Sequence, residues 1–498
     1  MQRFSNKRLS INLAVAAIVG TLWMFSGCAA VGPDYVKPET ATPEKWHTEL
    51  RDGLRSQPMD SERLAKWWQT LNDPVLTGLI EQAVAGNLDF RAATARLREA
   101  RAKRGISGAD RFPTINASGS ATKTRSSEST GSGIERDLYS TGFDAGWEID
   151  IFGGVRRSIE EADANVAASQ EDLYDVLVSM AAEIALNYVE VRSFQTRLSI
   201  ARANRDAQEE TFRLVQNRYD AGLAAQLELE QSRFNLESTR AEIPSLNTGL
   251  EQAKNRLAVL LGRQPGDLPQ EVAEHRPIPV TPIEIAVGVP AESLRRRPDV
   301  RRAEWELAAQ TARIGVATAE LYPKFSLLGS IGLESLSADN LFDISNRTYS
   351  IGPTFSWRIF DAGRVRQQIE VENARQEQAL IQYEAAILTA LEDVENALVA
   401  YADEQARRDN LDKASAAAER AVAQARNQYR AGLTDFQNVL DSQRSLLALQ
   451  DQLAVSNGTV TSNLVRLYKA LGGGWEAMDA TPSEIENRSS DNGLQTTD

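Results

Sequence analysis

Two stretches of the chain alternate between apolar and polar residues. The first runs from Leu138 to Ile151 and the second from Tyr349 to Ile359. A period of two predicts β-strands. The aromatic residues on their apolar faces are Phe143, Trp147, Phe355 and Trp357. Such a strand by itself suits a soluble β-sandwich as well as a transmembrane barrel, so the surrounding pattern has to decide.

A different pattern follows each strand. After Gly153, apolar residues recur at steps of three and four up to about Tyr219, which predicts one helix with a coiled-coil seam. At 1.5 Å per residue this helix spans roughly 95 Å, longer than a compact domain requires. Gly222 is placed to end it, and a second long helix is expected to return to Gly262.

The whole scheme occurs twice, because many residues recur at a constant separation of 210 positions. The matched pairs include Asp89 with Asp299, Pro113 with Pro323, Tyr139 with Tyr349, Trp147 with Trp357, Gly153 with Gly363, Tyr219 with Tyr429, Gly222 with Gly432, and Gly262 with Gly472. A fixed separation without gaps indicates a tandem duplication.

The repeat divides the chain into six segments. We expect a signal peptide at 1–27, a lipidated N-terminal arm at 28–72, a first repeat at 73–262, a proline-rich linker at 263–294, a second repeat at 295–472 and a polar tail at 473–498. The predicted strands are about 112–123 and 138–151 in the first repeat, and about 324–335 and 347–359 in the second. The paired Trp67 and Trp68 are expected to be core residues, and Asp73-Pro74 to begin a helix.

The N-terminus reads as a bacterial secretion signal. A basic start precedes the apolar run from Leu9 to Phe25, and Ser26-Gly27-Cys28 follows. Cys28 is the only cysteine, so no disulfide can form within the chain. Its position resembles a lipoprotein processing site, at which the cysteine would receive diacylglycerol and palmitate; the alternative is a free thiol after an ordinary signal-peptidase cut. No other apolar run is long enough for a membrane helix, so we expect any crossing to use strands.

Composition argues against two classes of function. A formal net charge of -14 disfavours a nucleic-acid partner. With only His47, His275 and one cysteine, the chain has no metal cluster, no nucleophile pair and no expected cofactor, so we do not expect an enzyme. A soluble coiled-coil scaffold remains the structural alternative to a channel.

Four strands per chain cannot close a barrel, and open edges would leave backbone groups unpaired in lipid. Two copies would give eight strands and a filled interior, whereas three copies would give twelve strands and room for water. The polar strand face carries charged residues, among them Asp144 and Glu148, so a trimeric pore is favoured. Long polar loops at 124–137 and 336–347 would face outward, and the helices would extend into the periplasm.

Four motifs carry a family resemblance that covers nearly the whole mature chain. They are GPDYVKP at Gly32, WWQTLNDPVL at Trp67, RRRPDVRRAE at Arg295 and YRAGLTDFQNVLDSQRSL at Tyr429. The chain resembles the TolC-like outer-membrane factor family, in its lipoprotein branch of OprM, CusC and NodT type. The resemblance implies an α+β membrane protein, a homotrimer with one 12-stranded barrel in outer-membrane lipid and a long α-helical periplasmic barrel.

The same resemblance implies partners and sites. The family serves as the exit duct of tripartite efflux pumps, with a periplasmic adaptor (membrane fusion) protein docked at the helical tips and an inner-membrane transporter of the RND type. The corresponding tip residues here are Gly222, Leu223, Gly432 and Leu433. Phe143, Trp147, Phe355 and Trp357 would face lipid.

By the resemblance, the second tip also holds the periplasmic gate. Family members place acidic residues at the positions of Asn438 and Asp441, of which only Asp441 is acidic here, and Asp435 is a neighbouring candidate. Tyr429 and Arg430 are expected to hold the closed state. Without the resemblance, Asp441 would read as part of a solvated helix face.

The cargo stays open between drugs, metal ions and small metabolites. The lipoprotein arm and the GPDY motif favour small-molecule efflux, and a duct for type I protein secretion is the alternative with the same fold.

Overall fold

The computed structural model describes residues 30–39, 42–57, 60–279 and 285–475. The predicted signal peptide, Cys28 and nearly all of the polar tail therefore lie outside the described residues. The chain separates into two compact units. Unit 1 comprises residues up to Glu39, Leu97–Ser169 and Arg302–Tyr383; unit 2 comprises Thr40–Arg96, Gln170–Arg301 and the chain from Glu384. Each unit is described by itself below.

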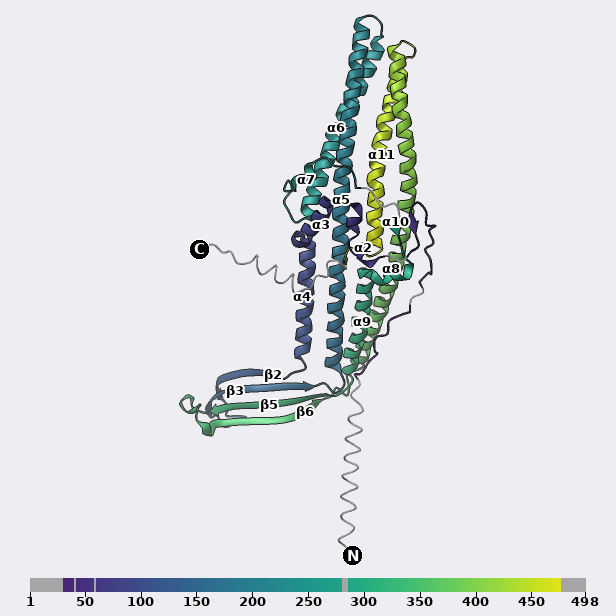
Figure 1. Ribbon diagram of the computed structural model, residues 1–498. Helices are drawn as coiled ribbons and strands as arrows, with labels where there is room; N and C mark the ends of the chain where they lie inside the picture. The colour runs from purple at the N-terminus through teal and green to yellow at the C-terminus, as the bar shows by residue number, and fades with distance from the viewer. Residues whose placement is uncertain (1–29, 40–41, 58–59, 280–284, 476–498) are drawn as a thin grey trace. The chain divides into compact units, whose positions relative to one another are not determined.

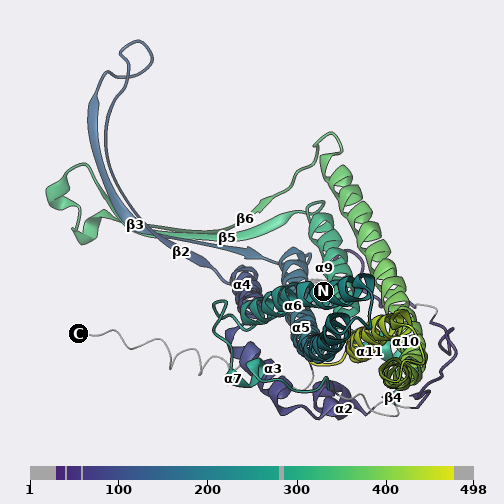
Figure 2. The same ribbon diagram turned by 90° about the horizontal axis from the view of Figure 1, so that it is seen from above.

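Unit 1 contains a four-stranded antiparallel sheet in the order β2, β3, β5, β6 (Figure 1). The strands are β2 (Thr114–Arg125), β3 (Glu135–Ile149), β5 (Lys324–Ser335) and β6 (Arg347–Ser356). Seen from above in Figure 2, they curve along their length. β3 starts earlier than the alternating pattern predicted, because the charged end of the hairpin stays paired: Lys123 lies 3.0 Å from Glu135.

Both edges of this sheet are open within the described chain, since β2 and β6 each pair on one side only. The apolar side chains along it are largely exposed, including Phe143, Ile331, Ile351 and Phe355. Among the described residues, no helix is both long and apolar enough to cross a membrane.

The six longest helices come in three pairs of equal length. The members are α4 (Leu88–Ala109) and α9 (Pro298–Ala319), with 22 residues each; α5 (Gly154–Asp220) and α10 (Arg364–Arg430), with 67 each; and α6 (Gln226–Leu260) and α11 (Phe436–Ala470), with 35 each. The two members of every pair start 210 positions apart, as in the sequence repeat.

The shorter elements surround the middle of the helices in unit 2 or cap the sheet in unit 1. They are β1 (Leu54–Arg55), which pairs in parallel with β4 (Ile285–Ala286), the helices α2 (Ser61–Ala65), α3 (Pro74–Gly86), α7 (Gln270–Ala273) and α8 (Pro290–Arg296), and the 3-10 turns η1 (Trp67–Leu71), η2 (Ala338–Asn340) and η3 (Ile344–Asn346).

Two sequence predictions for unit 2 are confirmed. Trp67 and Trp68 are buried, and the Trp67 ring stacks on Tyr468 at 5.6 Å. α3 begins at Pro74 and its N-cap is Asp73, whose carboxylate accepts the amides of Val75 and Leu76.

The proline-rich linker is fixed in place by one buried cation. The guanidinium of Arg192 on α5 is fully buried and donates to the backbone oxygens of Glu271, Val272 and Glu274, at the end of α7. A positive charge at a helix C-terminus satisfies the free carbonyls and opposes the helix dipole. Residues 271–274 of the linker are therefore held against α5.

Candidate functional site

The two long hairpins end in the same turn. At the α5–α6 turn, the amides of Gly222 and Leu223 donate to the carbonyls of Tyr219 and Arg218, at 2.9 and 2.7 Å. At the α10–α11 turn, Gly432 and Leu433 repeat these bonds, and both glycines have φ +74°. This is a helix C-cap that requires a left-handed residue, which glycine adopts without strain. Leu223 and Leu433 are exposed at equivalent positions of the two tips, and Leu227 is exposed as well at the first.

Next to the turns, the two hairpins share a small apolar core. Its buried members are Val215, Leu229, Ala425, Tyr429, Phe436, Val439 and Leu440, drawn from α5, α6, α10 and α11. Two of the rings, Tyr429 and Phe436, are 5.4 Å apart. The tip of the second hairpin is therefore attached to the first by packing.

Tyr429 is the polar centre of this core. Its hydroxyl donates to Glu228 Oε2 at 2.7 Å, and the guanidinium of Arg218 lies 4.7 Å from its ring centre and donates to its carbonyl oxygen at 3.2 Å. Burial and the contact with Glu228 raise the pKa of Tyr429, so the phenol remains a neutral donor at physiological pH. These three residues form what we call the tip latch.

The predicted closed-state pair differs from this latch. Tyr429 takes part, but the side chain of Arg430 is exposed and makes no hydrogen bond or ion pair with the described residues. The partners that sequence reasoning missed are Glu228 and Arg218. The only sequence signal for Glu228 was a carboxylate just after the first tip turn, and that signal is too common to be selective.

The three predicted gate residues lie at the start of α11. Asp435 is the N-cap residue, Asn438 donates to Thr434 at 2.7 Å, and both oxygens of Asp441 accept from Gln437 at 3.0 and 3.1 Å. Asp441 is exposed and has no cationic partner among the described residues. The structure thus leaves an uncompensated carboxylate here.

The predicted lipid-facing aromatics are exposed on the sheet. The indole N–H of Trp147 donates to the carbonyl of Arg111 at 2.9 Å, and that of Trp357 donates to Leu321 at 3.0 Å. Each bond joins a strand to the turn where a helix becomes the neighbouring strand. A ring that is apolar on its face and hydrogen-bonded at one edge is typical of a boundary between water and an apolar phase.

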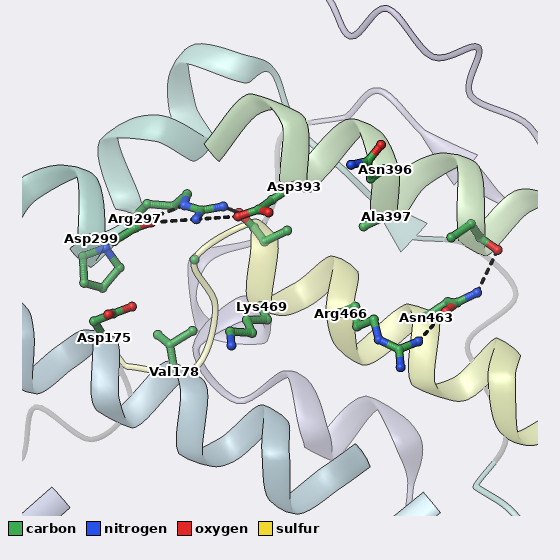
Figure 3. Close-up of a pocket in the computed structure, with 14 residues that line it drawn as sticks. Asp175, Val178, Arg297, Asp299, Asp393, Asn396, Ala397, Asn463, Arg466 and Lys469 are labelled. Carbon is green, nitrogen blue, oxygen red and sulfur yellow. Dashed lines mark hydrogen bonds and ion pairs between the residues drawn. The ribbon is translucent and has the colours of Figure 1, made fainter. Parts of the chain in front are cut away.

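Unit 2 also holds a cleft of about 450 Å³ between α5, α10, α11 and the start of α9 (Figure 3). Arg297 lies at one end, 2.6 Å from Asp299 and 2.9 Å from Asp393, and donates to the carbonyl of Ala470 at 3.0 Å. Burial lowers the pKa of Arg297, but the bonds to the two aspartates outweigh this effect and raise it overall.

The cleft suits a structural role better than a chemical one. At the equivalent position of the first repeat, Asn87 donates to the carbonyl of Leu260 at 2.8 Å. Arg297 makes the same bond to the end of a neighbouring helix, but with a charged group. The described residues contain no cluster of three or more potential metal ligands among His, Cys, Asp and Glu.

A comparison with known protein families decides how these features belong together. The profile of the family described as "Outer membrane efflux protein" matches residues 79–263 and 289–473. The chain belongs to the outer membrane efflux protein family. The two matched segments follow the two sequence repeats, so each half of the chain carries the family pattern. The predicted family and the outer-membrane location are therefore confirmed.

Relatives from this family match over most of their length. Nodulation protein T of Rhizobium leguminosarum bv. trifolii is 32% identical, over 86% of this chain and 91% of the relative. The cation efflux system protein CusC of Escherichia coli O6:H1 is 31% identical, over 91% and 96%. Among solved structures, the outer-membrane channel OprN is 37% identical, with a TM-score of 0.84 over 90% of this chain and 100% of that one. The chain therefore has the fold of outer-membrane efflux channels.

Proposed function

We propose that three copies of this chain form one outer-membrane channel that gives small molecules a passive exit from a tripartite efflux pump. The observation that carries the proposal is the four-stranded sheet, which has two open edges and an exposed apolar face. In lipid, unpaired strand edges are so costly that only a closed barrel is stable. Three copies supply twelve strands, enough for a water-filled lumen.

The helices support closure by more copies of the same chain. Within the chain, α5 of the first repeat packs against α11 of the second. A Cβ added at Gly458 of α11 would lie 3.3 Å from Ser193 Cβ of α5, and Arg197 pairs with Asp451 at 2.6 Å. We call this contact the inner seam.

The matching surfaces on the other two helices are more exposed, and on α10 the arm contacts this face through Glu395 and Asp403. Val189 of α5 is 0% exposed in the inner seam, whereas its counterpart Val399 on α10 is 44% exposed. Thr248 on α6, the counterpart of Gly458, is exposed as well. The α6 helix of a second copy can therefore pack on α10 of the first, in the same way as α11 packs on α5 within one chain. This outer seam joins different surfaces head to tail, an arrangement that forms a ring when the rotation between copies closes, as it does for three copies related by one third of a turn.

The tips and the arm complete the proposal. The exposed Leu223 and Leu433 would contact a periplasmic adaptor protein, and an inner-membrane transporter of the RND type would supply the energy. The tip latch would hold the closed state, and three copies of Asp441 would form a ring of negative charge at the entrance, a device that selects cations. Cys28 would carry diacylglycerol and palmitate as a second attachment to the outer membrane.

Cysteine pairs test the ring. Asp403→Cys with Thr248→Cys should form disulfides between copies and give species of two and three chains in non-reducing electrophoresis. Ser193→Cys with Gly458→Cys occupies the equivalent positions of the inner seam. This pair should form a disulfide within one chain, because the Cβ atoms are close enough. The Asp403 pair with Arg51 is exposed, so its loss should cost little. A water-soluble single chain that forms no intermolecular disulfide would contradict the proposal.

Cargo is tested in cells that lack the gene. Hypersensitivity to dyes, antibiotics or copper and silver salts is expected, and would separate drug from metal export. Loss of type I protein secretion with unchanged sensitivity would favour the secretion duct instead.

A further inference from the structure

The start of the described chain is held tightly against unit 1. Arg157 of α5 donates to the carbonyls of Val31 and Gly32 at 3.1 and 3.3 Å, and pairs with Asp34 at 2.7 Å. The amide of Val31 donates to the carbonyl of Phe152 at 3.0 Å. We call this set of contacts the arm clamp. These contacts account for Gly32 and Asp34 in the GPDYVKP motif.

The clamp leaves no spare room. Gly32 has φ +89°, and a Cβ there would collide with the backbone of Gly315 on α9. Gly153 has φ +84°, and a Cβ there would collide with Ala30. Farther along the arm, Lys37 pairs with Glu304 at 2.7 Å. Residues 31–37 of the arm are therefore held between α5 and α9.

Arg157 makes three of the four contacts of the clamp. Its side chain is only 5% exposed, and Glu160 at 2.7 Å provides a second carboxylate. Removing the guanidinium takes the donor away from two arm carbonyls and the cation away from Asp34, so three contacts between α5 and the arm are lost together. The neighbouring Arg156 instead faces Asp150, at 3.2 Å, and provides a matched control.

The clamp limits how far the residues just before Ala30 can reach from unit 1. A residue spans at most about 3.6 Å, so Cys28, two positions earlier, has its Cα within roughly 7 Å of Ala30. The bond from Val31 to Phe152 places this point beside the end of β3. By the strand register, β5 starts and β6 ends at the same edge of the sheet.

Exposed apolar side chains gather at this edge. The apolar shelf consists of Ile151, Leu321, Tyr322, Ile359 and Phe360, all exposed. Tyr322 stacks on Phe152 at 4.6 Å, which joins the shelf to the residue that anchors the arm. Fatty acyl chains are the apolar groups that the chain itself would carry within reach of this surface.

We propose that the apolar shelf receives the acyl chains of Cys28 and that Arg157 is a positioning residue, which holds the lipid anchor at the level where strands become helices. The inference rests on the proposed lipidation and deepens it. A clamped anchor enters the bilayer in register with the sheet, whereas an unclamped one would be held only by a flexible tether.

A photoactivatable palmitate analogue, fed to cells that make the full chain, tests this. In the wild type and in Arg156→Gln, illumination should attach the acyl chain mainly to peptides that contain 149–153, 319–325 or 357–361. In Arg157→Gln, the share of label in these peptides should fall at least threefold. Hydrogen exchange should rise in residues 31–37 of Arg157→Gln and stay unchanged in the rest of unit 1, which shows that the variant folds.

The possible failures are distinct. If the wild type takes up no label, or takes it up equally after Cys28→Ser, the proposed lipidation is wrong and the inference falls with it. If Cys28 is labelled but the acyl chain marks no peptide preferentially, or marks the same peptides in Arg157→Gln, the lipidation stands and the positioning role is overturned.

Discussion

The helices α5 and α10 have the same length and start 210 positions apart, yet they are covered differently. Val178 and Val189 on α5 are 3% and 0% exposed, whereas Leu388 and Val399, their counterparts on α10, are 68% and 44% exposed. Another face is buried on both helices, as Tyr188 and Leu398 show. The duplication therefore produced two similar surfaces, and the one on α10 stays largely exposed in the single chain. We interpret it as the surface that the next copy covers.

The tips show the same contrast. Tyr429 is 3% exposed and bonded to Glu228, while its counterpart Tyr219 is 38% exposed. The position that corresponds to Glu228 in the second repeat is occupied by Asn438. A repeat that retains its backbone can thus lose a specific polar contact through one substitution.

The most severe test places a charge in each seam. Val189→Asp buries a carboxylate in the inner seam, which should cost several kcal/mol and prevent the chain from folding. Val399→Asp should leave the secondary structure of the chain intact and abolish the trimer. Circular dichroism and size-exclusion chromatography in detergent distinguish the two. If both variants fail to fold, the proposed difference between the inner and outer seams is wrong.

A smaller effect is expected at the latch. Tyr429→Phe removes one hydrogen bond to a carboxylate, which contributes about 1.5–3 kcal/mol. The closed state should weaken, and single-channel conductance in planar bilayers should rise or flicker more often. Tyr219→Phe is the matched control and should behave like the wild type. A latch role is excluded if both variants conduct alike.

A stabilising variant sharpens the comparison further. The inner seam has the Arg197–Asp451 pair, but the counterparts in the outer seam are Arg407 and Ala241. Arg407 already pairs with Glu404 of its own helix at 2.9 Å. Ala241→Asp should add a carboxylate from across the seam and strengthen the trimer by up to about 1 kcal/mol, since the pair is partly exposed. The temperature at which the trimer dissociates should rise for Ala241→Asp and not for Ala241→Asn, and high salt should remove the gain.

The gate charge should have the smallest effect on stability. Asp441→Ala removes an exposed carboxylate and leaves the trimer intact. Conductance should increase and block by trivalent cations should weaken, because the ring of negative charge is lost. Arg430→Ala, which removes an exposed cation at the other side of the same turn, should not weaken the block. Unchanged block in Asp441→Ala would mean that the carboxylate belongs to a solvated helix face.

Local sequence patterns predicted the elements well, and long-range contacts poorly. Alternation identified the strands around Trp147 and Trp357, and glycine marked the turns at 222 and 432, because these features depend on neighbouring residues. The latch partner Glu228 is 201 residues from Tyr429, and Arg157 lies 123 residues from Asp34. No pattern within one helix shows which distant side chain will meet it.

The sequence by itself determined the duplication, the family, the lengths of the helices and the places where they turn, since each follows from local periodicity or from a repeated motif. Only the tertiary structure decided which of two equivalent helix faces is covered, which carboxylate Tyr429 bonds, and where the arm is clamped. The physical reason is that burial and ion pairing depend on partners that folding brings together from far apart in the chain.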